Sequence, residues 1–264
     1  MMTHRAASAG TRRQAFWTGS ILALALLSGC ATTPYRANPQ FEERLRGGLT
    51  VALVPPDVKV FQLTAGEVRE QMDEWSEMAQ RNVEAAIRKR LGSRGVLTVR
   101  EFDPAKFQSA GEELEDARSL FQAVALSVVL HTYQPETQFK TKMDRFDYSL
   151  GPLPALAGAS EADTLLFVNA LDHISTGGRV ARNIALALMG AATGVVAIPP
   201  GGVTAMAAAL VDSRTGDILW FNRRASGGAH DLRNPASADA FVAEAFEAFA
   251  STFPAGKPAI EKRP

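Results

Sequence analysis

The stretch Asp163-Thr164-Leu165-Leu166-Phe167-Val168-Asn169-Ala170-Leu171-Asp172 contains the strongest strand signal in the chain. Its apolar residues are contiguous instead of alternating with polar ones, which is typical of a strand whose two faces are both covered. We therefore expect a central strand that lies under helices, with the other elements arranged around it.

The remaining segments alternate between strand and helix patterns. A brief apolar run that Pro55 and Pro56 close indicates a buried strand. Two capping boxes, Thr64–Glu67 and Ser109–Glu112, each precede an apolar stripe at helical spacing. In chain order we expect a strand at 49–54, a helix over 64–91, a strand at 96–102, a helix over 109–131, a polar irregular stretch at 133–148, a short helical segment at 151–158, the strand at 163–172, a hairpin of 203–211 and 218–222, and a helix over 236–253.

A polar turn joins the last two expected strands. In Asp212-Ser213-Arg214-Thr215-Gly216-Asp217, Gly216 suits the left-handed position of a hairpin loop. The order of elements is strand, helix, strand, helix, strand, insertion, hairpin and helix. It predicts a single α/β domain with a mixed, mostly antiparallel-edged sheet of about five strands, flanked by three or more helices.

Composition fits a folded domain and argues against a nucleic-acid partner. The 264 residues are 46% hydrophobic and 21% charged, close to the globular average, so a packed core is expected. Residues 1–29 contain three arginines and no acid, so the remainder of the chain is mildly acidic. Such a body, without a block of basic residues, does not resemble a nucleic-acid surface.

Residues 1–29 have the three-part layout of a secretory signal: a basic start, the apolar run Ile21–Leu27 and small residues at the boundary. The run is shorter than the about 20 apolar residues that span a bilayer. It ends in Leu27-Ser28-Gly29-Cys30, which resembles the bacterial lipobox. The resemblance implies a covalent diacylglycerol and an N-acyl chain on Cys30, and no other cofactor is expected. The alternative is a plain signal peptide that happens to contain a cysteine.

Cys30 is the sole cysteine, so no disulfide can form within the chain. The next residue is Ala31 and not Asp, which in bacterial lipoproteins points to the outer membrane, here on its periplasmic side. The predicted organisation is a signal peptide at 1–29, a lipidated tether at 30–48, a periplasmic α/β domain at 49–253 with an apolar insertion at 177–202, and a polar tail at 254–264.

The insertion carries no charge between Ile184 and Ile198. Gly190 and Gly194, four residues apart, would let a helix approach a neighbour closely. At its start, Arg179 and Arg182 face either lipid phosphates or water. Three hypotheses stay open for this segment: packing on its own domain, contact with a partner or a second copy, and dipping into the bilayer.

The sequence contains no familiar catalytic or metal-binding motif. The histidines His131, His173 and His230 are isolated, which does not support a metal site. Asp172, His173 and Ser175 are the one hydrolytic trio to consider, but neighbours on a strand point to opposite faces, so Asp172 is badly placed to orient the imidazole. We expect no enzyme activity, and the sequence identifies no small-molecule substrate.

Three segments carry a resemblance to a known family. Asp212–Trp220 (DSRTGDILW), Val51–Pro55 and Ala162–Phe167 resemble a domain, similar to the TolB N-terminal domain, of bacterial envelope lipoproteins. These include the curli-secretion channel lipoprotein and the penicillin-binding-protein activator lipoprotein. The resemblance covers about residues 49–253 and implies binding of another envelope protein, or oligomerisation. Members that form channels insert hairpins with strands of about ten alternating residues, and 184–198 does not alternate.

The leading hypothesis is a lipid-anchored outer-membrane lipoprotein whose periplasmic domain is a non-catalytic binding or assembly module. Its partners would be the membrane, through the lipid, and an envelope protein or a second copy of the chain. The alternative is a subunit of an oligomeric secretion or export assembly that uses 177–202 as a contact or membrane element. A hydrolase built on Asp172, His173 and Ser175 is the third hypothesis.

Overall fold

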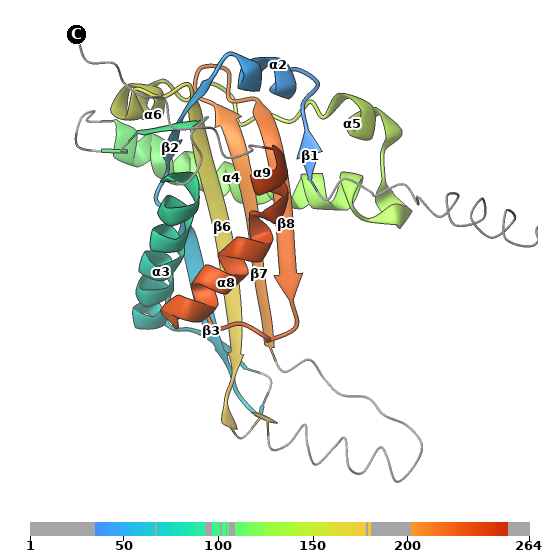
Figure 1. Ribbon diagram of the computed structural model, residues 1–264. Coiled ribbons are helices and arrows are strands. Elements are labelled where there is room, and N and C mark those ends of the chain that lie inside the picture. The colour runs from blue at the N-terminus through green and yellow to red at the C-terminus, as the bar shows by residue number, and fades with distance from the viewer. Residues whose placement is uncertain are drawn as a thin grey trace, which may run out of the picture. The chain divides into compact units, whose positions relative to one another are not determined.

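An open mixed sheet of eight strands forms the centre of the fold (Figure 1). The computed structural model describes residues 35–66, 68–92, 97–100, 102–103, 105, 109–177, 179–180 and 202–252. The main path of the sheet is β1-β8-β7-β6-β2-β5, with β3 paired to β6 and β4 paired to β3. The strands are β1 (Arg36–Ala37), β2 (Leu49–Leu53), β3 (Asp57–Leu63), β4 (Arg69–Gln71), β5 (Leu97–Arg100), β6 (Thr164–Ser175), β7 (Gly202–Asp212) and β8 (Ile218–Ser226).

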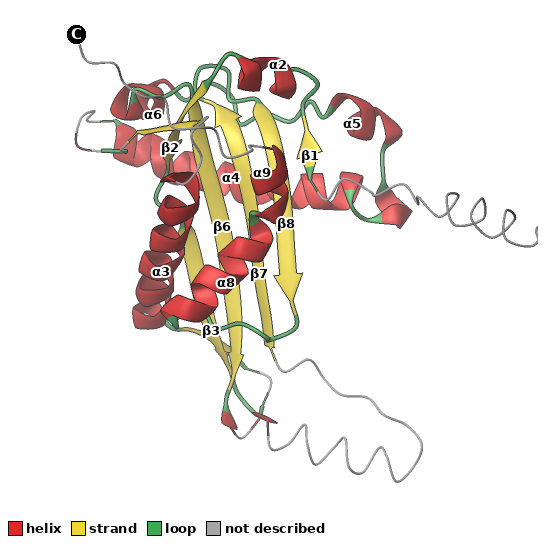
Figure 2. Cartoon of the chain, viewed as in Figure 1, coloured by secondary structure: helices red, strands yellow, loops and turns green. Residues whose placement is uncertain are grey.

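The prediction of a central strand at 163–172 is confirmed, because β6 has neighbours on both of its edges. It pairs in parallel with β2 and then β3 along one edge, and antiparallel with β7 along the other (Figure 2). The predicted α/β class is therefore correct, although the sheet has eight strands and not about five. The hairpin is also confirmed, with Gly216 at a φ of 76° in its turn.

The prolines do not take the chain out of the sheet. Strand β2 ends at Leu53, but the chain resumes pairing with β6 as β3, a strand that was not among the predicted elements. Pro55 and Pro56 have no N–H to donate, so they interrupt the ladder locally without changing the direction of the chain.

The first predicted capping box is wrong as a helix start. Thr64 lies in the turn between β3 and β4, where its backbone N–H donates to the Val68 carbonyl at 3.1 Å, and the helix α3 (Asp73–Gly92) begins later. Val68, counted in the apolar stripe, is 61% exposed. The backbone N–H and C=O groups of residues 69–71 pair with β3 in the sheet, so they do not need the hydrogen bonds of a helix.

Helices cover both faces of the sheet. Helix α3 and the pair α8 (Pro235–Ala245) and α9 (Glu247–Thr252) pack on one face, and α4 (Ala110–Thr132) lies on the other (Figure 1). The second face also receives α6 (Pro154–Ser160) and the stretch around Phe146. Along β6 the even-numbered residues Leu166, Val168 and Ala170 enter the first core, while Leu165 and Phe167 enter the second. Each face of the strand is apolar because each faces its own core.

The other helix predictions hold in outline and differ at the ends. Helix α4 ends at Thr132, close to the predicted His131, but Ser109 makes no side-chain capping bond. The predicted last helix is broken at Phe246 into α8 and α9. The irregular stretch at 133–148 contains a 3₁₀ turn (Pro135–Thr137) and the short helix α5 (Lys140–Arg145).

The folded domain begins earlier than the predicted tether allows. Residues Arg36 and Ala37 pair with Phe221 and Trp220, and the helix α2 (Phe41–Arg46) buries Phe41 in the first core. Residues 35–48 therefore belong to the same folded unit as the sheet. The predicted signal peptide and lipobox lie outside the described residues.

Candidate functional site

One half of one sheet face has no helix over it among the described residues. Helix α4 buries Leu165 and Phe167 of β6, but further along the same face Asn169, Leu171 and His173 are only half-buried. The opposite face of the same strand segment remains covered, with Ala170 in the first core. At this point the sheet therefore lacks a helical cover on one side and keeps it on the other.

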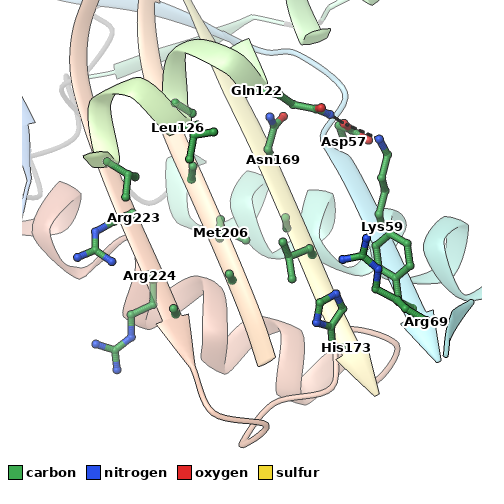
Figure 3. Close-up of a pocket in the computed structure, with 18 residues that line it drawn as sticks. Asp57, Lys59, Arg69, Gln122, Leu126, Asn169, His173, Met206, Arg223 and Arg224 are labelled. Atoms are coloured by element: carbon green, nitrogen blue, oxygen red, sulfur yellow. Dashed lines mark hydrogen bonds and ion pairs between the residues drawn. The ribbon is translucent and has the colours of Figure 1, made fainter. Parts of the chain in front are cut away.

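This uncovered half-face contains a hollow of about 570 Å³, which we call the sheet groove (Figure 3). Residues of β3, β6, β7 and β8 line it, and α4 overhangs it with Ala125, Leu126 and Val129. Leu126 is 60% exposed although it is apolar. The volume falls within the roughly 300–1,000 Å³ of pockets that hold small molecules.

Small side chains make the groove hollow. Ala205 and Ala207 of β7 and Ala225 of β8 lie at its floor, where larger residues would fill the space. Register places Ala205 opposite Ala225 and Ala207 opposite Arg223, so these side chains share one face of the sheet. The floor of the groove is therefore apolar, and the cationic residue Arg223 lies at its β8 edge.

Cationic side chains surround the groove. Lys59 and Arg69 lie with His173 at the β3 side, and Arg223 lies at the β8 side (Figure 3). The Arg69 guanidinium stands 4.9 Å above the Phe61 ring, and no described carboxylate pairs with it. The lining carboxylate, Asp57, accepts a 2.6 Å hydrogen bond from Gln122 and lies 3.8 Å from Lys59 Nζ. The groove consequently has a net positive lining.

A tyrosine fixes the cation on the β8 side. The ring of Tyr133 has the Arg223 guanidinium 4.7 Å from its centre and the Arg36 guanidinium at 4.3 Å. Burial raises the pKa of Tyr133 to about 12, so the phenol stays neutral at any physiological pH. Among the described residues, no carboxylate forms an ion pair with Arg223, whereas the neighbouring Arg224 pairs with Glu244.

His173 lies at the β3 side of the groove, where burial and neighbouring cations both act on its imidazole. Its ring makes an edge contact with Phe61, with ring centres 5.4 Å apart. Burial first, and then the charges of Arg69 and Arg179, lower the pKa of His173 below its ordinary value. The imidazole is therefore neutral at pH 7, and the guanidinium groups supply the charge.

Asp172 and His173 point to opposite faces of β6, as expected for neighbours on a strand. Asp172 is 1% exposed in the first core, where Thr204 Oγ1 donates to Oδ1 at 2.9 Å and Leu232 N donates to Oδ2 at 2.9 Å. Burial raises the pKa of Asp172. Both of its oxygens serve the protein itself, so the structure does not bring together the trio of Asp172, His173 and Ser175.

Of the predicted interaction residues, the structure describes Arg179 alone. It is 6% exposed and lies close enough to His173 to depress that residue's pKa. Arg182, Gly190 and Gly194 lie outside the described residues, as do Leu27, Ser28, Gly29 and Cys30. Within the described ranges, no group of three metal-ligating side chains occurs, and no helix is both long and apolar enough to cross a membrane.

The sheet groove was not anticipated from the sequence. A signal was present in β7, where Val203, Ala205 and Ala207 alternate with buried Thr204, Met206 and Ala208. Since alanine is common in buried strands as well, this pattern alone does not reveal an open face. Which residues of β3 and α4 border it depends on tertiary packing.

Comparison with known proteins adds no assignment. No protein-family model matches the chain, and none of the curated proteins is significantly similar to it in sequence.

Proposed function

We propose that this chain is a lipid-anchored lipoprotein of the bacterial outer membrane whose α/β domain faces the periplasm and binds a partner without catalysing a reaction. The observation that carries the binding role is the sheet groove, an apolar hollow beside which the guanidinium groups of Arg69 and Arg223 pack on aromatic rings and form no ion pair with a described carboxylate. A large exposed apolar surface is costly for a protein to keep unless something binds there. The lipobox-like Leu27–Cys30 supports the anchor.

Two features support a role without catalysis. The carboxylate of Asp172 is occupied by Thr204 and Leu232, and it faces away from His173. The described residues that line the groove include no serine, threonine or cysteine that could act as a nucleophile, and the serine–histidine contacts Ser127–His131 and Ser226–His230 lie outside the lining. The resemblance to envelope lipoproteins with a TolB N-terminal-like domain leads to the same proposal.

Labelling in cells tests the anchor. Radioactive palmitate should enter the native chain, whereas Cys30→Ser should incorporate none. Equal incorporation by both would overturn the anchored part of the proposal.

Photocrosslinking in cells tests the binding role. A photoreactive amino acid at Ala205, in the sheet groove, should yield a discrete adduct with a cellular component. The same amino acid at Met78, which is 42% exposed on α3, is the matched control and should yield none. Adducts at Met78 with none at Ala205 would place the binding surface elsewhere.

A second candidate function, a subunit of an oligomeric assembly, is favoured by the edge of β8. Strand β1 pairs only with Phe221 and Trp220, so no described strand covers the outer edge of residues 223–226. Open strand edges are sites of pairing with other chains. Mass photometry of the detergent-extracted protein distinguishes the two functions, because a monomer at every concentration contradicts the oligomeric one.

A further inference from the structure

The lining of the sheet groove indicates the chemistry of what it binds. The floor of Leu171, Ala205 and Ala207 is apolar, and Leu126 adds apolar surface from the overhanging helix. Contact with these residues would favour a hydrocarbon, because burial of apolar surface contributes about 25 cal/mol per Å². A purely polar ligand would gain little from this floor.

The charges at the groove select the sign of the ligand. Lys59, Arg69 and Arg223 are cationic. Asp57, the carboxylate in the lining, lies 3.8 Å from Lys59 Nζ and offsets that charge, which leaves the lining positive through Arg69 and Arg223. Arg224 also borders the groove, but its guanidinium pairs with Glu244 at 2.6 Å. An anion is therefore complementary to the lining and a cation is repelled by it.

The positions of the cations orient the ligand. Arg69 lies beside His173 at one end of the hollow, whereas the ammonium group of Lys59 points toward Asp57 (Figure 3). The apolar floor of β6 and β7 runs from Arg69 toward β8. Arg69 is held over the Phe61 ring, so its guanidinium is already placed at this end. Guanidinium groups suit carboxylates and phosphates because they can donate two parallel hydrogen bonds.

We propose that the sheet groove binds an amphiphile with a single acyl chain and an anionic head group, its chain on Leu171, Ala205 and Ala207 and its head at Arg69. The size of the hollow favours a small ligand over a protein segment. This inference rests on the proposed binding role and names the ligand class for that site.

The test uses the full chain in membranes and three photoreactive probes. The probes share one diazirine-bearing acyl chain and end in a carboxylate, an alcohol or a trimethylammonium group. The carboxylate probe should label peptides of β6 and β7 in a saturable way, with at least tenfold more product than the trimethylammonium probe. The alcohol should fall between them, since it keeps the chain and loses the charge.

Two variants separate the role of the floor from that of the charge. Ala207→Trp should fill the hollow and reduce labelling by all three probes about tenfold. Arg69→Gln should reduce labelling by the carboxylate probe about tenfold and leave the alcohol unchanged. Arg145→Gln, the same substitution at an exposed arginine of α5 outside the groove, is the control and should label like the native chain. Thermal unfolding of each variant checks that the fold is retained.

The outcomes distinguish this inference from the proposed function. Equal labelling by the three probes, or full labelling of Ala207→Trp, overturns the amphiphile. If a crosslinker at Ala205 then captures a protein, and Ala207→Trp abolishes that adduct, the binding module stands and its ligand is a protein. If neither Ala205 nor Met78 captures anything, the binding role itself fails.

Discussion

The backbone N–H of Leu232 donates a 2.9 Å hydrogen bond to Oδ2 of Asp172, inside the core between the sheet and α8. Oδ1 of the same carboxylate accepts a 2.9 Å bond from Thr204 on the neighbouring strand. Leu232 lies in the loop between β8 and α8, and α3 also holds this loop. Asn82 Nδ2 of α3 donates to the carbonyls of Leu232 at 3.0 Å and Arg233 at 2.8 Å. One residue is thus fixed through its N–H and its carbonyl by two distant side chains.

Removal of the Asp172 carboxylate should destabilise the domain. Asp172→Ala leaves the Leu232 N–H buried without an acceptor, which costs about 1–3 kcal/mol. The Thr204 hydroxyl can still donate to the His230 carbonyl, at 3.2 Å. The free energy of unfolding in urea should therefore fall by at least about 1 kcal/mol. Asp144→Ala, at a carboxylate that is 58% exposed and pairs with Lys140, is the control and should change it by less than about 0.5 kcal/mol. An equal effect in both variants would contradict the structural role of Asp172.

Asp172 and Asn82 should be energetically coupled. Because both hold Leu232, the loss of one bond loosens the residue to which the other binds. A double-mutant cycle of Asp172→Ala and Asn82→Ala should give an interaction energy of at least about 0.5 kcal/mol. The cycle of Asn82→Ala with Asp144→Ala should be additive, and additivity in both cycles would show that the two bonds act independently.

His173 should make the stability of the domain depend on pH. Its folded pKa lies below the unfolded value of 6.5, so the unfolded chain binds a proton first as the pH falls. The stabilisation of the folded state that the neutral His173 imidazole contributes is complete above about pH 6.5. It is lost as the pH falls through the folded pKa. His173→Gln should therefore flatten the unfolding free energy between about pH 7 and pH 5. An unchanged slope would refute the shift.

Arg69 should contribute to the depressed pKa of His173. In an NMR titration of the ring, Arg69→Gln should move that pKa upward, because a positive charge next to the imidazole is removed. The shift should be partial, since burial is the largest cause and Arg179 remains. Arg145→Gln is again the control, and a change of the same size there would mean that net charge, and not proximity, sets the pKa.

Gly216 should be intolerant of any side chain. It has a φ of 76°, and a Cβ built there would collide with the backbone of Gly151. Gly216→Ala should lower the free energy of unfolding by more than about 1 kcal/mol, from strain in the turn and displacement of the neighbouring segment. Gly111→Ala in α4 is the matched control, because a Cβ there meets nothing within 4 Å. Its stability should be unchanged or higher by up to about 1 kcal/mol.

Long-range pairing explains why parts of the fold could be predicted and others could not. The contiguous apolar run at 163–172 identified the central strand because burial on both faces leaves a local mark in the sequence. Strand β3 left no such mark, since Asp57 and Lys59 are polar residues on the open face. Thr64 can begin either a helix or a turn, and only the pairing of β4 with β3, next to the bond from Thr64 N–H to the Val68 carbonyl, decides between the two.

The sequence by itself determined the α/β class, the central strand, the hairpin with Gly216 in its turn, and the opposite orientation of Asp172 and His173. These properties follow from the two-residue period of strands and from the backbone freedom of glycine, which act between near neighbours. Only the tertiary structure decided that α4 stops short of covering the sheet, and that Arg69, Lys59 and Arg223 surround the hollow this leaves. Those residues come from separate elements, and packing alone brings them to one site.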